Sequence, residues 1–165
     1  MLEEVINLDK KLFIFLNNLG SEPFDGIWLL VTKQFNWIPF FLLLLVILYK
    51  KIGTKQLVIV LLTVAALITF TNEITDLIKF SVQRIRPCND EELVGLIRIV
   101  KDSDTFSYFS GHAANSTAAM MFVFLILRGF YKYTYLIFLY PLIFAYSRIY
   151  LGLHFPLDII SGYIF

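Results

Sequence analysis

Cysteine is almost missing from this chain of 165 residues, since Cys88 is the only one. A single thiol cannot form an intramolecular disulfide, so the sequence excludes a disulfide-stabilised fold and makes redox chemistry a poor first hypothesis. Charged residues are also scarce, at 16% of the chain, and the net charge is only +1. No basic block or stripe stands out, so we expect no nucleic acid as a partner.

The N-terminus lacks the features of a cleaved secretory signal. It begins with the acids Glu3 and Glu4. A secretory signal would instead have a basic segment, followed by a clean apolar stretch and a small-residue cleavage site. We therefore expect it to belong to the mature protein. Internal repeats and low-complexity linkers are absent as well, which predicts a single domain over residues 1–165.

Hydrophobic residues are abundant, at 58% of the chain, and the mean hydropathy of +0.73 lies well outside the range of a soluble domain of this size. Aromatic residues reach 17%, with 17 Phe and 9 Tyr, which is typical of helices that contact lipid and of aromatic belts at the two membrane interfaces. We therefore predict an integral membrane protein that is surrounded by membrane lipids.

The apolar runs predict an all-α polytopic membrane helix bundle with an N-terminal interfacial helix and about five transmembrane helices. Residues 1–24 mix apolar and charged positions, as an interfacial helix does, and Gly20 and Pro23 break this segment. The next spans are expected over about residues 27–49, 57–80, 111–127 and 134–150, and a fifth begins near Phe155. Its 11 residues are too few for a crossing, so we expect the last span to be incomplete in this sequence.

Two short turns are basic and contain no acid, residues 50–55 (KKIGTK) and 128–132 (RGFYK). Alternation of the spans places both turns on one face of the membrane. The long polar connection over residues 83–110, the turn at 147–154 and the N-terminal segment share the opposite face. The positive-inside rule makes the face with the basic turns cytoplasmic and the other face extracytoplasmic.

A first polar cluster lies at the end of the second expected span, in KFSVQRIRP. If the helix continues to its end, Lys79, Gln83 and Arg86 share one stripe, and Pro87 ends the helix. Two cations would then point the same way. The alternative is that basic residues at a helix end simply extend their charges toward water.

A second cluster, FSGHAANS, joins the long polar connection to the third expected span. Ser110 is suited to cap the helix, which would leave the amides of Gly111 and His112 as donors for an anion at the helix N-terminus. The alternative is ordinary capping, with a histidine that has only a structural role.

The third cluster is SRIYLGLHFPLD, near the end of the chain. Arg148 closes the fourth expected span, and Pro156 suits the first turn of the next helix. His154 and Asp158 are four residues apart, which on a helix places them on one face. A carboxylate there can hold one imidazole nitrogen and leave the other free to attack. The alternative is an ion pair that only stabilises the start of the helix.

All three clusters are expected on the same face of the membrane. Ionisable residues at membrane depth are costly and are usually retained for function. Three cations, two histidines, a carboxylate and free helix amides supply what phosphoryl transfer needs: positive charge around the phosphate oxygens, a nucleophile and a proton donor. The sequence therefore predicts a phosphoryl-transfer site that faces a lipid headgroup.

These residues resemble the signature of a known family, the type 2 phosphatidic acid phosphatase (PAP2) superfamily. It includes membrane lipid phosphate phosphatases and is related to vanadium-dependent haloperoxidases. The matching positions are Lys79-x6-Arg86-Pro87, Ser110-Gly111-His112 and Ser147-Arg148-x5-His154-x3-Asp158. The length and hydropathy of the chain are also similar to those of small bacterial members. One position departs from the pattern, because Phe109 stands where the family usually has proline.

The resemblance implies a phosphatase that works through a phosphohistidine intermediate. His154 would attack phosphorus, Asp158 would orient it, and His112 would protonate the leaving group. The residues that would bind the phosphate are Lys79, Arg86, Arg148, Ser110 and Gly111. Family members need no metal, so we expect neither a metal nor another cofactor.

The expected substrate is a lipid phosphate or diphosphate, such as undecaprenyl diphosphate, phosphatidylglycerophosphate or phosphatidic acid. Undecaprenyl diphosphate is favoured because small bacterial members of the family often hydrolyse it. The expected location is the bacterial inner (cytoplasmic) membrane, with the active site on the extracytoplasmic face. The oligomeric state is left open by the sequence.

Two other kinds of function remain open at this point. His112, His154 and Asp158 could be ligands in a metal-dependent hydrolase, although three neighbouring cations argue against it. An anion-binding membrane transporter would keep the basic cluster but has no need for the spacing of His154 and Asp158. Chelator tests the first alternative, and His154→Ala tests the second.

Overall fold

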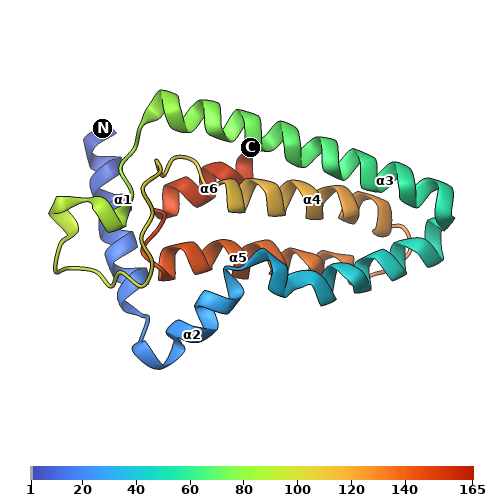
Figure 1. Ribbon diagram of the computed structural model, residues 1–165, viewed down its shortest axis with the longest axis horizontal. Helices are drawn as coiled ribbons and strands as arrows, with labels where there is room; N and C mark the ends of the chain where they lie inside the picture. The colour runs from blue at the N-terminus through green and yellow to red at the C-terminus, as the bar shows by residue number, and fades with distance from the viewer. Residues whose placement is uncertain (1) are drawn as a thin grey trace.

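The computed structural model describes residues 2–165, and these form α-helices and 3-10 helices without a strand. In Figure 1 the helices α3, α4 and α5 run along the long axis of the molecule, while α1 and α2 lie at one end. The elements in chain order are α1 (Leu2–Asn18), α2 (Glu22–Val31), η1 (Gln34–Trp37), α3 (Ile38–Val82), η2 (Pro87–Asn89), η3 (Glu91–Leu93), α4 (Gly111–Leu127), η4 (Thr134–Phe138), α5 (Leu139–Tyr150) and α6 (Pro156–Ile164). The predicted all-α class is confirmed.

Helix α1 lies across the end of the bundle and contacts α5 and α6 (Figure 1). Glu3 and Glu4 stand in its first turn, where negative charge favours the helix dipole. Its buried side chains, Asp9, Phe13 and Asn17, are spaced four apart and therefore share one face. This amphipathic pattern agrees with the helix expected near the N-terminus.

The break predicted at Gly20 and Pro23 is confirmed, since α1 ends at Asn18 and Pro23 lies in the first turn of α2. The span predicted over residues 27–49 is wrong in its first part. Helix α2 ends at Val31, and α3 begins only at Ile38. Side chains between them bind the carbonyls at the end of α2, because Asn36 Nδ2 donates to Leu30 O over 2.7 Å and Trp37 Nε1 donates to Val31 O over 2.8 Å.

Helix α3 consists of two arms that meet at Gly53. Gly53 has φ 74°, a backbone conformation that glycine adopts without steric cost. The arms turn back on one another there, so the predicted turn over residues 50–55 is confirmed (Figure 1). The ammonium of Lys51 lies 5.0 Å from the ring centre of Tyr131, which places this turn beside the second basic turn.

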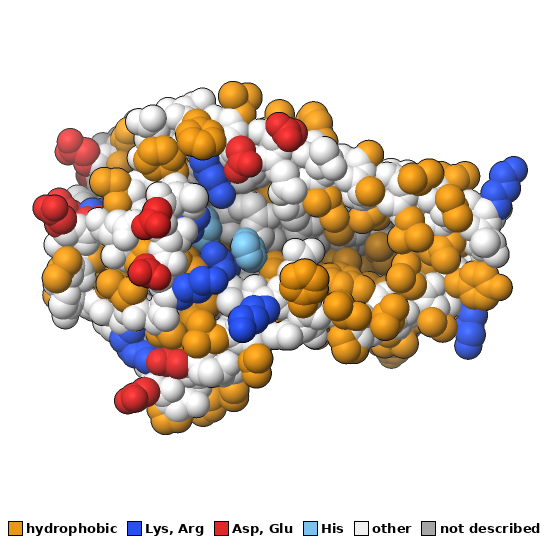
Figure 2. Space-filling model, in the orientation of Figure 1, with side chains coloured by type: hydrophobic (Ala, Val, Ile, Leu, Met, Phe, Trp, Pro, Cys, Tyr) orange, Lys and Arg blue, Asp and Glu red, His pale blue; other side chains and the backbone are white. Residues whose placement is uncertain are grey.

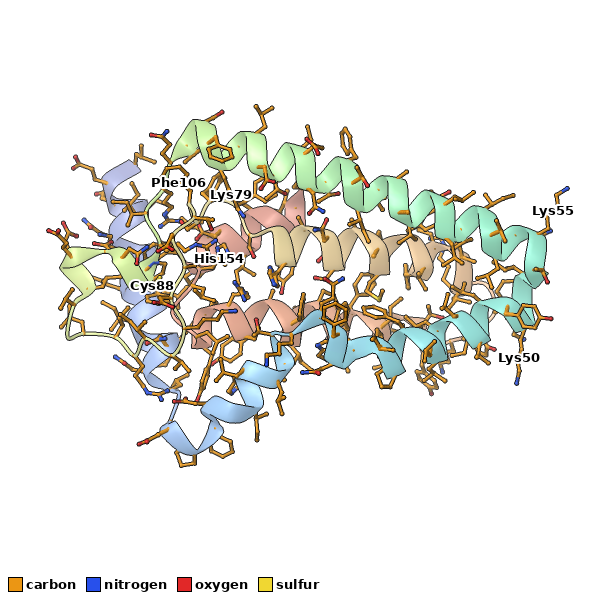
Figure 3. All side chains as sticks on the ribbon, viewed as in Figure 1. Lys50, Lys55, Lys79, Cys88, Phe106 and His154 are labelled. Atoms are coloured by element: carbon orange, nitrogen blue, oxygen red, sulfur yellow. The ribbon has the colours of Figure 1, made fainter. Side chains whose placement is uncertain are left out.

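The two basic turns and the three polar clusters lie at opposite ends of the molecule, as the alternation of spans predicted. Figure 3 shows Lys50 and Lys55 at one end and Lys79, Cys88 and His154 at the other. Figure 2 shows that charged side chains gather at the end that carries α1 and α2, whereas the rest of this face is largely apolar.

Helix α4 packs against α3, α5 and α6, and its bounds match the predicted third span. The predicted fourth span is a 3-10 helix, η4, that continues into α5. Helix α6 approaches the start of α4 very closely at Gly162. A Cβ atom there would lie 2.7 Å from Ser110 O and 3.0 Å from Ala113 Cβ.

The outer surface of α3 is apolar and unusually exposed. Leu62, Leu77 and Phe80 are 67%, 64% and 70% exposed, which suits a helix that contacts lipid chains. Within residues 2–165, the helical region Gln34–Leu93 has the length and composition of a membrane span, and Gly111–Leu127 is a shorter apolar helix. The exact number of spans remains a prediction.

Candidate active site

Arg86 reaches the site from a loop and not from a helix, so the predicted stripe of Lys79, Gln83 and Arg86 is wrong. Helix α3 ends at Val82, because Gln83 adopts a left-handed conformation with φ 52°. The amide of Gln83 donates to Lys79 O over 2.9 Å and so closes the helix end. Gln83 is exposed, whereas Arg86 is only 4% exposed.

The guanidinium of Arg86 is held from three sides. Its Nε and Nη2 donate to Thr105, to the carbonyl over 2.8 Å and to the hydroxyl over 2.7 Å. Its Nη1 lies 2.8 Å from Leu153 O and 3.0 Å from His154 Nε2. Because a guanidinium can only donate, His154 Nε2 accepts this bond and carries a lone pair. The other ring nitrogen, Nδ1, then carries the proton.

His154 Nδ1 faces Asp158 Oδ2 at 3.4 Å. The predicted proximity of the two side chains is therefore observed, but its predicted cause is wrong: His154 lies before α6, and only Asp158 is helical. The N–H of Phe155 donates to the same carboxylate oxygen over 2.9 Å, which draws the loop and the helix start together. Both side chains are almost fully buried.

Burial and the charges of Arg86 and Arg148 lower the pKa of His154 well below its ordinary value. The imidazole is therefore neutral at neutral pH. A neutral imidazole with one nitrogen protonated and the other bearing a lone pair is the form that can act as a nucleophile.

Sequence reasoning missed two residues beside this pair: Arg84, which binds Asp158 directly, and Asp9, which binds Arg84. Arg84 Nη1 donates to Asp158 Oδ1 over 2.7 Å, and its Nη2 donates to Asp9 Oδ2 over 2.6 Å. Its guanidinium also lies 4.0 Å from the ring centre of Phe155. Asp9 is 3% exposed and accepts the N–H of Leu157 over 2.9 Å. The one available signal in the sequence was an acid on the apolar stripe of α1.

Ser110 caps α4 as predicted, since its hydroxyl accepts the N–H of Ala113 at 3.4 Å. Its own N–H donates to Asp158 O over 2.9 Å, which fixes the helix start beside α6. The amides of Gly111 and His112 open the helix, where no preceding turn supplies an acceptor. The His112 ring stacks on Phe144, with ring centres 5.0 Å apart.

Arg148 and Lys79 complete the set of cations. Arg148 is buried in α5, and its Nη1 donates to Thr32 Oγ1 over 2.7 Å. Within residues 2–165 its Nε has no partner. Lys79 borders a cavity of about 590 Å³, together with Gly111 and His112. In Figure 2 the histidine side chains lie at a hollow beside several basic side chains.

The predicted site residues are thus gathered at one end of the molecule. Direct hydrogen bonds join Arg86, His154, Asp158 and Ser110, while Lys79, Gly111 and His112 border one cavity. Among residues 2–165, no group of three or more His, Cys, Asp or Glu side chains could hold a metal ion. The cationic side chains and free helix amides can bind an oxyanion. The lone pair of His154 Nε2 can attack an electrophile.

Fold and site together define a helical membrane protein with a polar site suited to phosphate. Residues 56–165 match the PAP2 superfamily, so more than half of the chain is covered. The chain belongs to this superfamily and is a membrane lipid phosphatase.

Several curated relatives cover nearly the whole chain. A lipid A 4'-phosphatase of Bacteroides thetaiotaomicron is 30% identical over 98% of this chain and 73% of its own length. A lipid A 4'-phosphatase of Porphyromonas gingivalis is 26% identical over 98% of this chain and 69% of its own length. An undecaprenyl-diphosphatase of Sulfolobus acidocaldarius is 29% identical over 98% of this chain and 75% of its own length.

A solved structure shows the same fold. It is the crystal structure of a transmembrane PAP2-type phosphatidylglycerolphosphate phosphatase from Bacillus subtilis, with a TM-score of 0.67. It is 16% identical, and the match covers 97% of this chain and 79% of the other. The predicted polytopic membrane bundle therefore agrees with a structure of the family.

Proposed function

We propose that this protein removes phosphate from a lipid phosphate or diphosphate, with His154 as the nucleophile. The position of His154 between Arg86 and Asp158 is the observation that supports this most directly. Asp158 holds the protonated nitrogen, and the lone pair of Nε2 points toward a cation that would bind phosphate. The same geometry orients the nucleophile and places the substrate charge beside it.

In the first step, His154 Nε2 attacks phosphorus, and the bond from phosphorus to the leaving oxygen breaks. His112 donates a proton to that oxygen, so the lipid leaves as an alcohol or a lipid monophosphate. The phosphate oxygens are bound throughout by Lys79, Arg86, Arg148, Ser110 and Gly111. Arg86 is already beside Nε2, so it can shift its hydrogen bond from the imidazole to the incoming phosphate.

In the second step, water attacks the phosphohistidine and His112 accepts its proton. The bond between phosphorus and nitrogen breaks, inorganic phosphate is released, and His154 recovers its lone pair. Lys79, Arg86 and Arg148 supply the positive charge around the phosphate, and His112 activates the water, so the proposed mechanism uses no metal ion.

The lipid would bind with its hydrocarbon chains in the cavity beside Lys79 and His112. Most of its wall consists of aliphatic and aromatic side chains from α3, α4 and α5, including Leu48, Val64 and Val123. The relatives act on three different lipids, namely lipid A, undecaprenyl diphosphate and phosphatidylglycerolphosphate. The shared element is a lipid that carries phosphate.

The proposed location is the bacterial inner membrane, with the site on the extracytoplasmic face. The separation of the basic turns from the site supports it, because the positive-inside rule assigns basic turns to the cytoplasm.

The test is release of inorganic phosphate by the purified protein in detergent and excess chelator, from a panel of lipid phosphates and diphosphates. The parent protein should release phosphate, and His154→Ala should lower the rate by a factor of about 10³ or more. Loss of activity in chelator would favour a metal-dependent hydrolase. Complete absence of release by a folded parent protein would favour a transporter.

A further inference from the structure

The cavity changes in character along its length. At one end it is bordered by Lys79 and His112, and at the other by aliphatic and aromatic side chains. Polar side chains from α3 and α4 also border it, among them Asn72, Thr75, Asp76 and Asn115. Polar groups on membrane helices are costly and are usually retained for function, so their position in this wall needs an explanation.

Two of these side chains carry buried atoms that lack a hydrogen-bond partner. Asn115 Nδ2 donates to Asn72 Oδ1 over 2.6 Å, but Asn115 Oδ1 has no partner. Thr75 is 2% exposed, and its Oγ1 also has none. Within residues 2–165 only five buried side-chain polar atoms lack a partner, and two of them border this cavity. Such atoms destabilise a fold unless something binds them.

The positions fit a group next to the substrate phosphate. Asn72 lies seven residues before Lys79 on α3, which corresponds to about 10 Å along the helix. Asn115 lies three residues after His112 on α4, which corresponds to about 4.5 Å. Thr75 lies beside Gly111, because a Cβ atom on that glycine would be 3.3 Å from Thr75 Cγ2. A sugar ring or a glycerol unit fills this range.

The available atoms select the chemistry. Asn115 Oδ1 and the carboxylate of Asp76 accept hydrogen bonds and cannot donate them. They favour hydroxyl and amide N–H groups, while Asp76 repels a second phosphate. In a polyprenyl diphosphate the part beyond the first phosphate is another phosphate followed by hydrocarbon, which offers no donor.

We propose that Asn72, Thr75 and Asn115 form a headgroup subsite that binds hydroxyl or amide groups lying between the phosphate and the hydrocarbon chains of the substrate. This proposal rests on the proposed phosphatase function and narrows the class of lipid substrate. It favours a lipid phosphate with a sugar or glycerol headgroup over undecaprenyl diphosphate, which the sequence had favoured.

The experiment compares kcat/KM for two probes on the same protein sample, an acylated glucosamine phosphate and farnesyl diphosphate. Asn115→Leu and Thr75→Val remove the polar atoms with little change in volume. Each should lower kcat/KM for the glucosamine lipid about tenfold and leave farnesyl diphosphate within about twofold, because a lost hydrogen bond affects only the probe that makes it. Thr117→Val is the matched control, since Thr117 also has a buried unpartnered hydroxyl but does not border the cavity.

The ratio of the two kcat/KM values does not depend on how much of the sample is folded. An unchanged ratio in both Asn115→Leu and Thr75→Val would overturn the subsite while leaving the phosphatase function intact. Absence of activity toward every lipid phosphate, in the parent protein, would instead overturn the proposed function on which the subsite depends.

The N-terminal helix α1 also contacts the site, at residues that do not border the cavity. Arg84 lies between two buried carboxylates, 2.6 Å from Asp9 Oδ2 and 2.7 Å from Asp158 Oδ1. The Asp9 and Asp158 side chains are 1% and 0% exposed, and that of Arg84 is 19% exposed. Asp9 lies on α1, outside the residues 56–165 that match the family.

These contacts fix both oxygens of Asp158. Oδ1 accepts from Arg84, and Oδ2 accepts from Phe155 N–H and faces His154 Nδ1. Asp9 binds the other end of the Arg84 guanidinium and also the N–H of Leu157, next to Asp158. If Asp9 were neutral, Arg84 would keep only one carboxylate partner and could rotate.

We infer that Asp9 is a positioning residue, which acts through Arg84 and Asp158 to hold His154 in line with the phosphate. Asp9→Asn keeps the size and an acceptor for Leu157 N–H but removes the charge. It should lower kcat about tenfold with little change in KM, because orientation of the nucleophile affects the transition state more than substrate binding. Asp9→Glu should restore part of the lost kcat.

Lys10→Gln is the matched control on the same helix. Lys10 binds Asp90 and Glu92, each over 2.7 Å, and thus fixes α1 to the long loop without contacting Arg84 or Asp158. It should lower the thermal midpoint and leave kcat within about twofold. An Asp9→Asn variant with the kcat of the parent, or a Lys10→Gln variant with an equal loss of kcat, would overturn the positioning role.

Discussion

Thr32 shows how a single side chain outside the family signature can hold Arg148, a proposed phosphate-binding residue, in place. It is 5% exposed and lies just after α2, where its hydroxyl accepts a hydrogen bond from Arg148 over 2.7 Å. No sequence pattern predicts this contact, because the two residues are 116 positions apart.

Thr32→Val should therefore lower kcat/KM for a lipid phosphate by about tenfold, since a hydrogen bond to a charged group contributes about 1.5 to 3 kcal/mol. Steady-state kinetics of the purified variant provide the measurement. Thr63→Val serves as the control, because Thr63 is exposed on α3 and bonds only to Ile59 O in its own helix. A parent-like kcat/KM in Thr32→Val would show that Arg148 needs no such support.

Asp25 is a residue outside the site whose hydrogen bonds stabilise the fold. Arg98 Nη2 donates to both carboxylate oxygens, over 2.8 and 2.9 Å, and the hydroxyl of Tyr150 donates to Oδ1 over 2.8 Å. The hydrogen bond from Arg98 is the main reason that the pKa of Asp25 is below its ordinary value. A carboxyl whose pKa is lower in the folded state stabilises the fold above its unfolded pKa of about 4 and loses that contribution as the pH falls further.

Asp25→Asn should lower the free energy of unfolding by about 1 kcal/mol at neutral pH, since the pair is partly exposed. Thermal unfolding in detergent at several pH values gives the measurement. The difference between parent and variant should shrink as the pH falls below about 4, where the parent carboxylate takes up its proton. A difference that stays constant over this range would contradict the ion pair as its cause.

At the residue scale, the predictable part of the site was the part set by local chemistry. Ser110 was expected as a helix cap because its side chain and the start of the helix are adjacent in sequence, and it does cap α4. Arg84, Asp9 and Thr32 could not be found in this way. Their contacts depend on how α1 and the loop after α2 pack against the bundle.

At the scale of elements, the predicted helix ends are correct where residues adjacent in sequence determine them. They are wrong where side-chain contacts in the folded structure determine them. The turn at Gly53 and the start of α4 follow from glycine and from capping, and both were predicted. The break between α2 and α3 depends on side-chain bonds from Asn36 and Trp37 to helix carbonyls. The periodicity of apolar residues contains no such information.

Gly162 is the residue on which the packing of α6 against α4 depends. Gly162→Ala should destabilise the protein by about 1 to 3 kcal/mol, because the added methyl would lie 2.7 Å from Ser110 O. It should also lower activity, since Ser110 begins the helix that borders the site. Gly26→Ala in α2 is the control, with nothing within 4 Å of the added atom. Equal thermal midpoints for the two variants would contradict the close approach.

At the scale of the whole molecule, the two ends differ in chemistry. Basic turns occupy one end, and the site with its acidic and basic side chains occupies the other (Figures 2 and 3). A lipid phosphatase with this polarity would meet headgroups on only one side of the membrane.

The orientation can be measured with single cysteines in a Cys88→Ser background. Asp104→Cys lies in the exposed part of the long loop, and Lys50→Cys lies at the opposite end. A membrane-impermeant thiol reagent should label the first variant in intact cells and the second only after permeabilisation, because basic turns are retained in the cytoplasm. The reverse pattern would place the site on the cytoplasmic face.

The most direct test of the central claim is to locate the phosphoryl group during turnover. His112→Ala should accumulate the intermediate from p-nitrophenyl phosphate, a probe whose leaving group needs no proton, since hydrolysis of the intermediate lacks its base. After an alkaline quench, mass spectrometry should find a phosphoryl group on His154 and none in His112→Ala/His154→Ala. Phosphate release without any modified His154, or with the phosphoryl group on another residue, would contradict the mechanism.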